Sequence, residues 1–323
     1  MNHATSRRAI LAISFAAALA IAPGALAQST TGTPQNQQQT PSTPSNPPAS
    51  QPAKPGDFNP APVGTGTNAG AAAVTPAAPA KIDPAEEAAY KAFDDLKPDD
   101  EDKKAPRGGD ADRDKQVKLG EDFVAKYPLS QHDLQVYTQL VQDYYTKQEM
   151  DKMFAAAKSA LNLDPDDVSV LVLVGWVIPH STSGGDPEGN QRLDLAEQYE
   201  KHALELIQTL PKPANLTDEQ FAQAKKQAES EAHSGLGLVY FRRQDLPNSV
   251  TQLQASTTAA PNIDPTDYFV LGLDLMQLKR YSEAADAFTK CTSVPGGLKD
   301  QCTQRLNTAK TAAANTPAAA PKQ

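Results

Sequence analysis

The chain has 323 residues, of which 39% are hydrophobic, and its 30 basic and 39 acidic residues give a net charge of −9. Nucleic acid and anionic membrane surfaces are poor partners for such a chain, because both are negatively charged themselves. After the first 27 residues, no stretch reaches the roughly 18 apolar residues that a membrane-spanning helix needs. The composition therefore predicts an acidic chain without a transmembrane segment beyond its start.

The first 27 residues have the pattern of a cleavable secretory signal. Arg7 and Arg8 form a positive start, residues 9–22 are an apolar run, and Ala25-Leu26-Ala27 is a small-x-small cleavage site. No cysteine stands at the cleavage point, so a lipid anchor is not expected; retention as an uncleaved anchor is the alternative. Cleavage leaves 28 basic and 39 acidic residues, a net charge of −11. The pattern predicts a periplasmic or secreted protein.

Residues 28–83 have the composition of a disordered linker. They hold 11 prolines in 56 residues, four charged residues and one aromatic residue, Phe58. Such a segment buries too little apolar area to offset its chain entropy, and its prolines keep it extended. We expect a plain spacer, with an envelope tether or a glycosylated stalk as alternatives.

From Pro84 the pattern becomes helical, with helices expected over residues 84–97 and about 111–126, separated by a charged run. We interpret them as an irregular first hairpin with an inserted loop. Four acids in this region have the spacing of a calcium loop of the EF-hand type: Asp110, Asp112, Asp114 and Glu121. However, Lys115 stands where glycine makes the turn, and Lys118 falls on a further ligand position. The segment is therefore interpreted as an acid-rich helix start, and no metal is expected.

The clearest pattern lies in residues 265–298, where two runs with the 3.6-residue period of an amphipathic helix flank a polar break. The positions are Tyr268, Leu271, Gly272 and Leu275, then Tyr281, Ala284, Phe288 and Cys291. Gly272 and Ala284 are expected to let the two backbones approach. The pattern resembles the tetratricopeptide repeat, a helical hairpin of about 34 residues.

Two other segments, residues 134–165 and 233–261, repeat this pattern in register, the second of them 35 residues before the last frame. In the second, Ser249 and Ser256 replace alanine, and each hydroxyl is expected to bond back to the preceding turn.

A distorted copy covers residues 171–210. Its first helix is expected to end at Pro179, followed by a flexible insertion over 180–192 and a second helix from Leu193, with Ala196 and Ala203 on its packing face. Thr217 to Gln220 form a capping box that opens a long helix. Residues 299–314 are predicted to form a helix that caps the last hairpin, and residues 315–323 a disordered tail.

The resemblance covers roughly residues 130–298 and extends more weakly to 84. It implies an all-α solenoid over residues 84–314, with about four to five hairpins plus the C-terminal capping helix. It also implies that the first helices line a concave groove for a peptide or helix. The groove offsets select Tyr145, Trp176, Leu238, Phe241, Phe269, Leu273 and Met276, and further Gln135, Thr138, Gln142, Val172, Glu231 and Ser234. The alternative is that these side chains pack neighbouring first helices together.

Cys291 and Cys302 are the only cysteines. In an exported chain they are expected to be oxidised, and the short turn between the two helices brings them together. We therefore predict a disulfide that fastens the capping helix; two free thiols are the alternative.

No catalytic or cofactor motif is found. The histidines after the signal stand singly, without zinc-ligand spacing, and no phosphate loop or nucleophile turn exists. The chain is therefore predicted not to be an enzyme and to need neither cofactor nor metal.

The lysine and asparagine set with which some tetratricopeptide proteins clamp a terminal carboxylate is absent, which favours apolar or strand-like ligands. The sequence thus predicts a non-catalytic protein-interaction scaffold of the bacterial cell envelope, with a protein partner in the groove. The alternative is a small-molecule or glycan-binding module, with Trp176 stacking on the ligand and the insertion forming the rim.

Overall fold

The computed structural model describes residues 83–96, 110–182, 185–259 and 262–316. Over these ranges the chain is all-α, as predicted; none of the described helices is long and apolar enough to cross a membrane. The predicted signal peptide, almost all of the predicted linker and most of the predicted tail lie outside the described residues. The helices are α1 (Pro84–Asp94), α2 (Asp110–Lys126), α3 (Asp133–Thr146), α4 (Met150–Leu163), α5 (Val168–Ser181), α6 (Pro187–Thr209), α7 (Asp218–Arg242), α8 (Leu246–Ala259), α9 (Pro265–Gln277), α10 (Tyr281–Ser293) and α11 (Lys299–Ala314).

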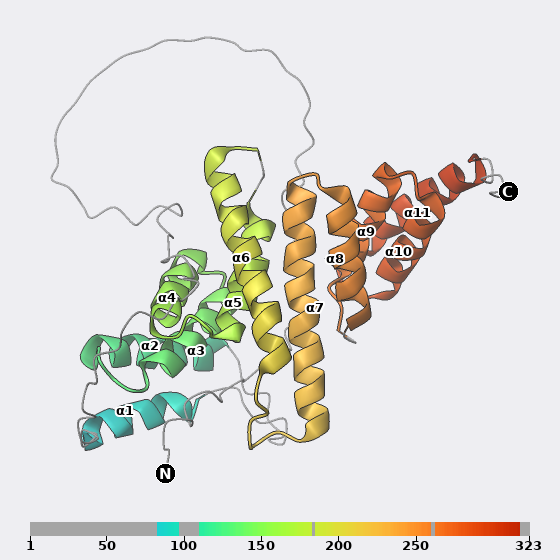
Figure 1. Cartoon of the computed structure of the whole chain (residues 1–323). Coiled ribbons are helices and arrows are strands. Elements are labelled where there is room, and N and C mark those ends of the chain that lie inside the picture. Colours follow the sequence, from blue (N-terminus) through green and yellow to red (C-terminus); the bar gives the residue numbers. More distant parts are fainter. Residues whose placement is uncertain (1–82, 97–109, 183–184, 260–261, 317–323) are drawn as a thin grey trace, which may run out of the picture.

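The helices pack as consecutive hairpins. Each odd-numbered helix from α1 to α9 contacts the even-numbered helix that follows it, and α11 packs against α10. Figure 1 shows the hairpins following one another across the molecule, with α1 and α11 at opposite ends. The helices α3, α5, α7 and α9 also contact one another in turn, and we call these four the inner row. The predicted array of hairpins with a C-terminal capping helix is confirmed.

Three of the hairpins close with the same backbone turn. Each turn contains a residue with a positive φ, which is 60° at Gln148, 61° at Gln244 and 60° at Lys279. The residue after it donates its N–H to the carbonyl group five residues earlier, in the pairs Glu149–Tyr144, Asp245–Tyr240 and Arg280–Leu275. This is the Schellman motif, in which a left-handed residue ends a helix. Glycine is favoured there because a Cβ atom raises the energy of this conformation.

Helix α5 is the buried centre of the N-terminal hairpins. It is apolar on nearly every side because α6 and α7 pack against it, with α4 at its edge. Asp167 caps its start by accepting the N–H groups of Ser169 and Val170 at 3.0 and 3.2 Å. The prediction that Pro179 ends this helix is wrong, since α5 continues to Ser181. Pro179 has no N–H to donate to the carbonyl four residues earlier, so α5 lacks one backbone hydrogen bond there, and the helix continues for two more residues.

Helix α6 starts six residues earlier than predicted. The sequence suggests a flexible insertion over residues 180–192, but residues 187–192 are the first turns of α6. Asp186 is the N-cap and accepts the N–H of Gly189 at 2.7 Å, while Pro187 takes the first helical position. This start signal prevails over the glycine-rich composition around it.

Glycines of the inner row leave space for side chains from the second helix of each hairpin. A Cβ atom on Gly272 would lie 2.5 Å from the ring of Phe288, and one on Gly237 would lie 2.6 Å from the side chain of Leu253. The space at Gly272 therefore holds an aromatic ring from the facing helix. In the α5–α6 hairpin, the corresponding space at Gly175 holds the side chain of Glu200, at 2.6 Å from such a Cβ.

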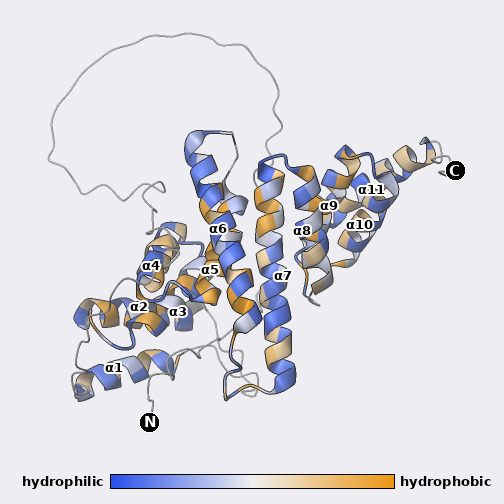
Figure 2. Ribbon diagram, viewed as in Figure 1, coloured by the Kyte–Doolittle hydropathy of each residue, from blue (hydrophilic) through white to orange (hydrophobic). Residues whose placement is uncertain are grey.

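Helix α7 begins with the predicted capping box. Thr217 Oγ1 accepts the N–H of Gln220 at 3.2 Å, and Gln220 Oε1 accepts the N–H of Thr217 at 2.9 Å. The first turns are hydrophilic in Figure 2, and burial begins at Ala228, where the helix packs against its neighbours. The long helix is therefore held mainly by its C-terminal half.

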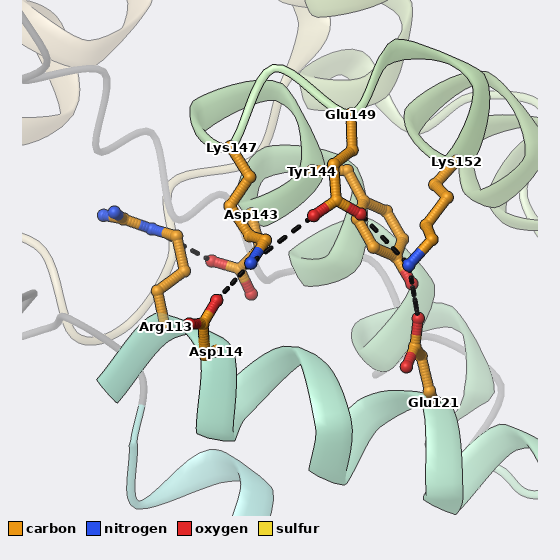
Figure 3. A network of polar contacts seen from close by, with 8 residues as sticks. All are labelled: Arg113, Asp114, Glu121, Asp143, Tyr144, Lys147, Glu149 and Lys152. Atoms are coloured by element: carbon orange, nitrogen blue, oxygen red, sulfur yellow. Dashed lines mark hydrogen bonds and ion pairs between the residues drawn. The ribbon is translucent and has the colours of Figure 1, made fainter. Parts of the chain in front are cut away.

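Polar contacts fasten α2 to the α3–α4 hairpin (Figure 3). Lys147 pairs with Asp114, Lys152 pairs with Glu121 at 3.2 Å, and Tyr144 donates to Glu121 at 2.7 Å. The segment with calcium-loop spacing thus begins a helix, as interpreted from the sequence, and two of its four acids, Asp114 and Glu121, bind lysines of the protein. Each of these two ion pairs adds little to stability by itself, because its acid is exposed.

The C-terminal end is held by a disulfide. Cys291 on α10 and Cys302 on α11 are bonded, with their Cα atoms 5.9 Å apart, as the sequence predicts. Both are buried in the core that α7 to α11 form together. The bond therefore ties the capping helix to the last hairpin.

Candidate functional site

All the residues predicted to face a groove lie on the inner row, and the seven main candidates among them fall into two groups by burial. Leu238 and Phe269 are 4% and 5% exposed and belong to the C-terminal core. The other five are half-buried: Tyr145, Trp176, Phe241, Leu273 and Met276. The buried pair holds the helices together, whereas the half-buried five keep part of their surface accessible to a ligand.

Trp176 on α5 connects three inner-row helices. Its ring lies edge-on to Tyr145 of α3, with centroids 6.1 Å apart and an interplanar angle of 86°. Its indole Nε1–H donates to Ser234 Oγ of α7 at 3.2 Å. The ring of His180, one turn further along α5, lies 3.8 Å from the indole. The indole is therefore held in one orientation and still has accessible surface.

Ser234 continues this contact into a buried carboxyl group. It donates to Asp267 Oδ1 at 2.6 Å, and Ser256 donates to Asp267 Oδ2 at 2.5 Å. Burial, followed by the charge of Asp264, raises the pKa of Asp267 to about 7. The hydroxyl of Ser256 thus bonds across to α9, and that of Ser249 bonds to the carbonyl of Gly237 on α7, so the predicted bonds to the preceding turn are wrong.

Two half-buried acids lie near the aromatic pair. Glu231 is one turn before Ser234 on α7, and Asp264 is the N-cap of α9, where it accepts the N–H of Thr266 at 2.8 Å. Burial raises the pKa of Glu231 to about 7, and the charge of Asp267 adds to the effect. Burial also raises the pKa of Tyr145 to about 12, with contributions from the charges of Asp264 and Glu231. We call Tyr145, Trp176, Glu231, Asp264 and Asp267 the acidic–aromatic cluster.

Glu200 contacts the helices of this cluster from the second helix of the α5–α6 hairpin. It belongs to α6, is 0% exposed, and its carboxyl group lies between Gly175 of α5 and Gly235 of α7, where a Cβ atom on either glycine would overlap it. Neither oxygen has a hydrogen-bond partner among the described residues. Burial raises the pKa of this carboxyl well above its usual value, and the nearby charge of Glu231 raises it further. Burial therefore favours the neutral form of this acid, which is held against the inner row.

The cluster is negative and has no cation paired with it in the described ranges. No ion pair there involves Glu231, Asp264 or Asp267, although ion pairs are present elsewhere in those ranges. Arg242 of α7 is bound elsewhere, since its Nε donates to the carbonyl oxygen of Pro179 at 2.9 Å. The described residues hold no group of three potential metal ligands.

Sequence reasoning placed Tyr145, Trp176 and Glu231 on this face but missed Glu200 and the two aspartates. A glutamate within a helix normally faces water, so Glu200 gave no sign of burial. The available signal was its register, because it stands where α8 and α10 carry Leu253 and Phe288. Asp264 and Asp267 read as ordinary helix-start acids.

The order of hairpins, their turns and the capping helix define a helical-hairpin repeat protein of tetratricopeptide-like architecture. No family model matches the chain, and no curated protein matches it. Among solved structures, a thermophilic tetratricopeptide protein of Thermus thermophilus matches with a TM-score of 0.42 and 13% identity, over 70% of this chain and 99% of that one. Function is therefore argued from the side chains of the inner row.

Proposed function

We propose that the chain is a non-catalytic protein-interaction scaffold that holds a peptide or helix of a partner along its inner row. The observation that carries this proposal is the environment of Trp176, the only tryptophan of the chain. It is half-buried, fixed by contacts to α3 and α7, and next to a second half-buried aromatic residue. Oriented aromatic residues with accessible surface are the usual anchors of protein interfaces.

We also propose that the scaffold works in the bacterial cell envelope. The signal pattern of the first 27 residues supports export. The Cys291–Cys302 disulfide supports an oxidising compartment, since such bonds persist mainly outside the cytosol. A long proline-rich segment between the signal and α1 would let the array reach away from an attachment point.

Co-purification from envelope extracts tests the scaffold with three forms of the full chain: wild type, the variant Trp176→Ala/Phe241→Ala, and the control Leu129→Ala/Leu163→Ala. The two control leucines are 98% and 53% exposed and lie outside the inner row. Circular dichroism first confirms that each form is folded. The proposal predicts a partner that is bound by wild type and control and lost from the inner-row variant. A partner retained by that variant would contradict it.

A fluorescence titration with sugars, made beside the co-purification, separates the glycan-binding alternative from the scaffold. Quenching of Trp176 emission by sugars, with no protein partner, would favour a small-molecule or glycan module over the scaffold. The structure offers this alternative less support than the sequence did, because much of the segment expected to form its rim belongs to α5 and α6.

A further inference from the structure

We propose that the acidic–aromatic cluster is an anchor point for one lysine or arginine side chain presented by the partner peptide. This inference rests on the proposed scaffold function and specifies the chemistry of its ligand. It differs from the expectation of an apolar or strand-like ligand that the sequence suggests.

The aromatic pair supplies the first part of the recognition. Tyr145 and Trp176 meet edge to face at 6.1 Å, and both are half-buried, so ring surface of each stays accessible. A lysine or arginine cation is attracted to such ring faces, and its aliphatic stem packs on apolar surface at the same time. An acidic or neutral polar side chain gains neither contact.

The acids supply the second part. Glu231 and Asp264 are both half-buried, and no cation of the described residues pairs with either. The charges that raise the pKa values of Tyr145, Glu231 and Asp267 all come from neighbouring acids. A cation placed among them relieves this mutual repulsion and forms charge-assisted hydrogen bonds. A partner carboxylate would be repelled at the same place.

Glu200 is an independent observation that points to the same ligand. A fully buried carboxyl group with no hydrogen bond to either oxygen is costly, and the α7–α8 and α9–α10 hairpins place leucine and phenylalanine on the equivalent glycine. Its carboxyl points between α5 and α7 toward the helix face that carries Glu231, whose charge it feels. A bound cation close to this carboxyl group would favour its ionised form, for which the described residues provide no hydrogen bond or ion pair.

Arg242 does not fill this role. Its guanidinium is engaged with the carbonyl of Pro179 and lies near His180, at the C-terminal end of α5. The charge of Asp264 also acts on His180, so the ligand cation is expected on the side of Tyr145 and Glu231.

The test uses a display library of random 12-residue peptides, panned on the full chain. Selected peptides are synthesised, and their Kd values are measured from the emission of Trp176, the only tryptophan. We expect the selected peptides to share a lysine or arginine. Replacing that residue by norleucine should weaken binding roughly tenfold, the loss expected for a charged hydrogen bond. Glu231→Gln should weaken the parent peptide by a similar factor.

The two changes should not add, because each removes the same contact. Asp264→Asn, which preserves the helix cap, should weaken binding by a smaller factor. Glu219→Gln is the matched control, since Glu219 is exposed at the start of α7, away from the cluster, and this variant should bind as wild type does. Thermal unfolding confirms that every variant is folded.

Other outcomes would overturn the inference in distinguishable ways. Peptides that lose affinity in Tyr145→Leu, but need no basic residue and ignore Glu231→Gln, would contradict the cation anchor and leave the scaffold proposal standing. If no peptide binds, or if binding ignores Tyr145→Leu and Glu231→Gln alike, both proposals fail.

Discussion

The carboxyl group of Glu200 occupies the space beside Gly175 in the same way that the ring of Phe288 occupies the space beside Gly272. The two hairpins share a packing position, but one fills it with an aromatic ring and the other with an acid that has no partner. At the position of Glu200, the pattern of the other two hairpins predicts an apolar side chain, but this hairpin has a buried acid. This exchange costs stability and places a buried acid next to the helices that carry Trp176 and Glu231.

Replacing Glu200 by leucine should stabilise the protein. Leucine fills the equivalent place on α8, and removing a buried group without hydrogen bonds should raise the unfolding free energy by about 1–3 kcal/mol. The measurement is denaturant unfolding at pH 7. Glu205→Leu, at an exposed position of the same helix, is the control and should change stability by about 0.5 kcal/mol or less. A destabilised Glu200→Leu variant would show that the acid has a stabilising partner.

Stability should fall as pH rises from 5 to 8. Burial raises the pKa of Glu231 and Asp267 to about 7, and that of Asp143 and Asp274 to about 6. Such acids bind more protons in the folded state, so their contribution is present below the unfolded pKa near 4 and is lost as pH rises through the folded values. Burial lowers the pKa of His180, which acts in the opposite direction as pH falls below about 6.5. The stability that the four acids lose as pH rises should exceed the stability that the one histidine gains, so the net stability should fall.

The expected decline is a Tm lower by about 5 °C at pH 8 than at pH 5, measured by circular dichroism at constant ionic strength. Asp267→Asn should reduce this difference, while Asp286→Asn, at an exposed position of α10, should leave it unchanged. A Tm that rises steadily over the same interval would refute the prediction.

The left-handed turn residues offer sites for stabilisation. Gln148→Gly, Gln244→Gly and Lys279→Gly should each raise the unfolding free energy by about 0.5–1 kcal/mol, because glycine adopts a φ near 60° without the strain of a Cβ atom. Gln254→Gly, at an exposed position within α8, should instead cost about 1 kcal/mol. Equal losses in all four variants would show that the turns are not left-handed in solution.

Reduction of the disulfide should loosen the C-terminal end. Breaking the bond between Cys291 and Cys302 should cost about 2–3 kcal/mol, because it opens a short loop that constrains the unfolded chain. Hydrogen exchange should then increase in α11 and leave α5 unaffected, since α5 belongs to the other core. Two reactive thiols in the unreduced, exported protein would show that the disulfide is not formed and would contradict this prediction.

Much of this fold could be predicted from local patterns. The 3.6-residue spacing located the hairpins, and the capping residues at Thr217 and Gln220 marked the start of α7. Predictions failed where one local signal opposed another, as at Pro179, which lies inside α5, and at residues 187–192, where an Asp-Pro cap starts a helix in a glycine-rich segment.

The candidate site was predicted only in part. Helical spacing shows which face a residue occupies, so it found Tyr145 and Trp176. It could not show that Asp264, at a helix start, and Glu200, on a second helix, converge on that face, because their meeting depends on how three hairpins stack. Burial of an acid is a property of the assembled helices and leaves little trace in the local sequence.

The most direct test of the central claim is the indole N–H signal of Trp176 in a heteronuclear NMR spectrum of the full chain. Because the chain has one tryptophan, a single indole signal reports on the inner row. Titration with a selected lysine- or arginine-containing peptide should shift this signal saturably, and the norleucine version should shift it at roughly tenfold higher concentration. A peptide that binds the chain with the indole signal unmoved would place the binding surface elsewhere and contradict the account.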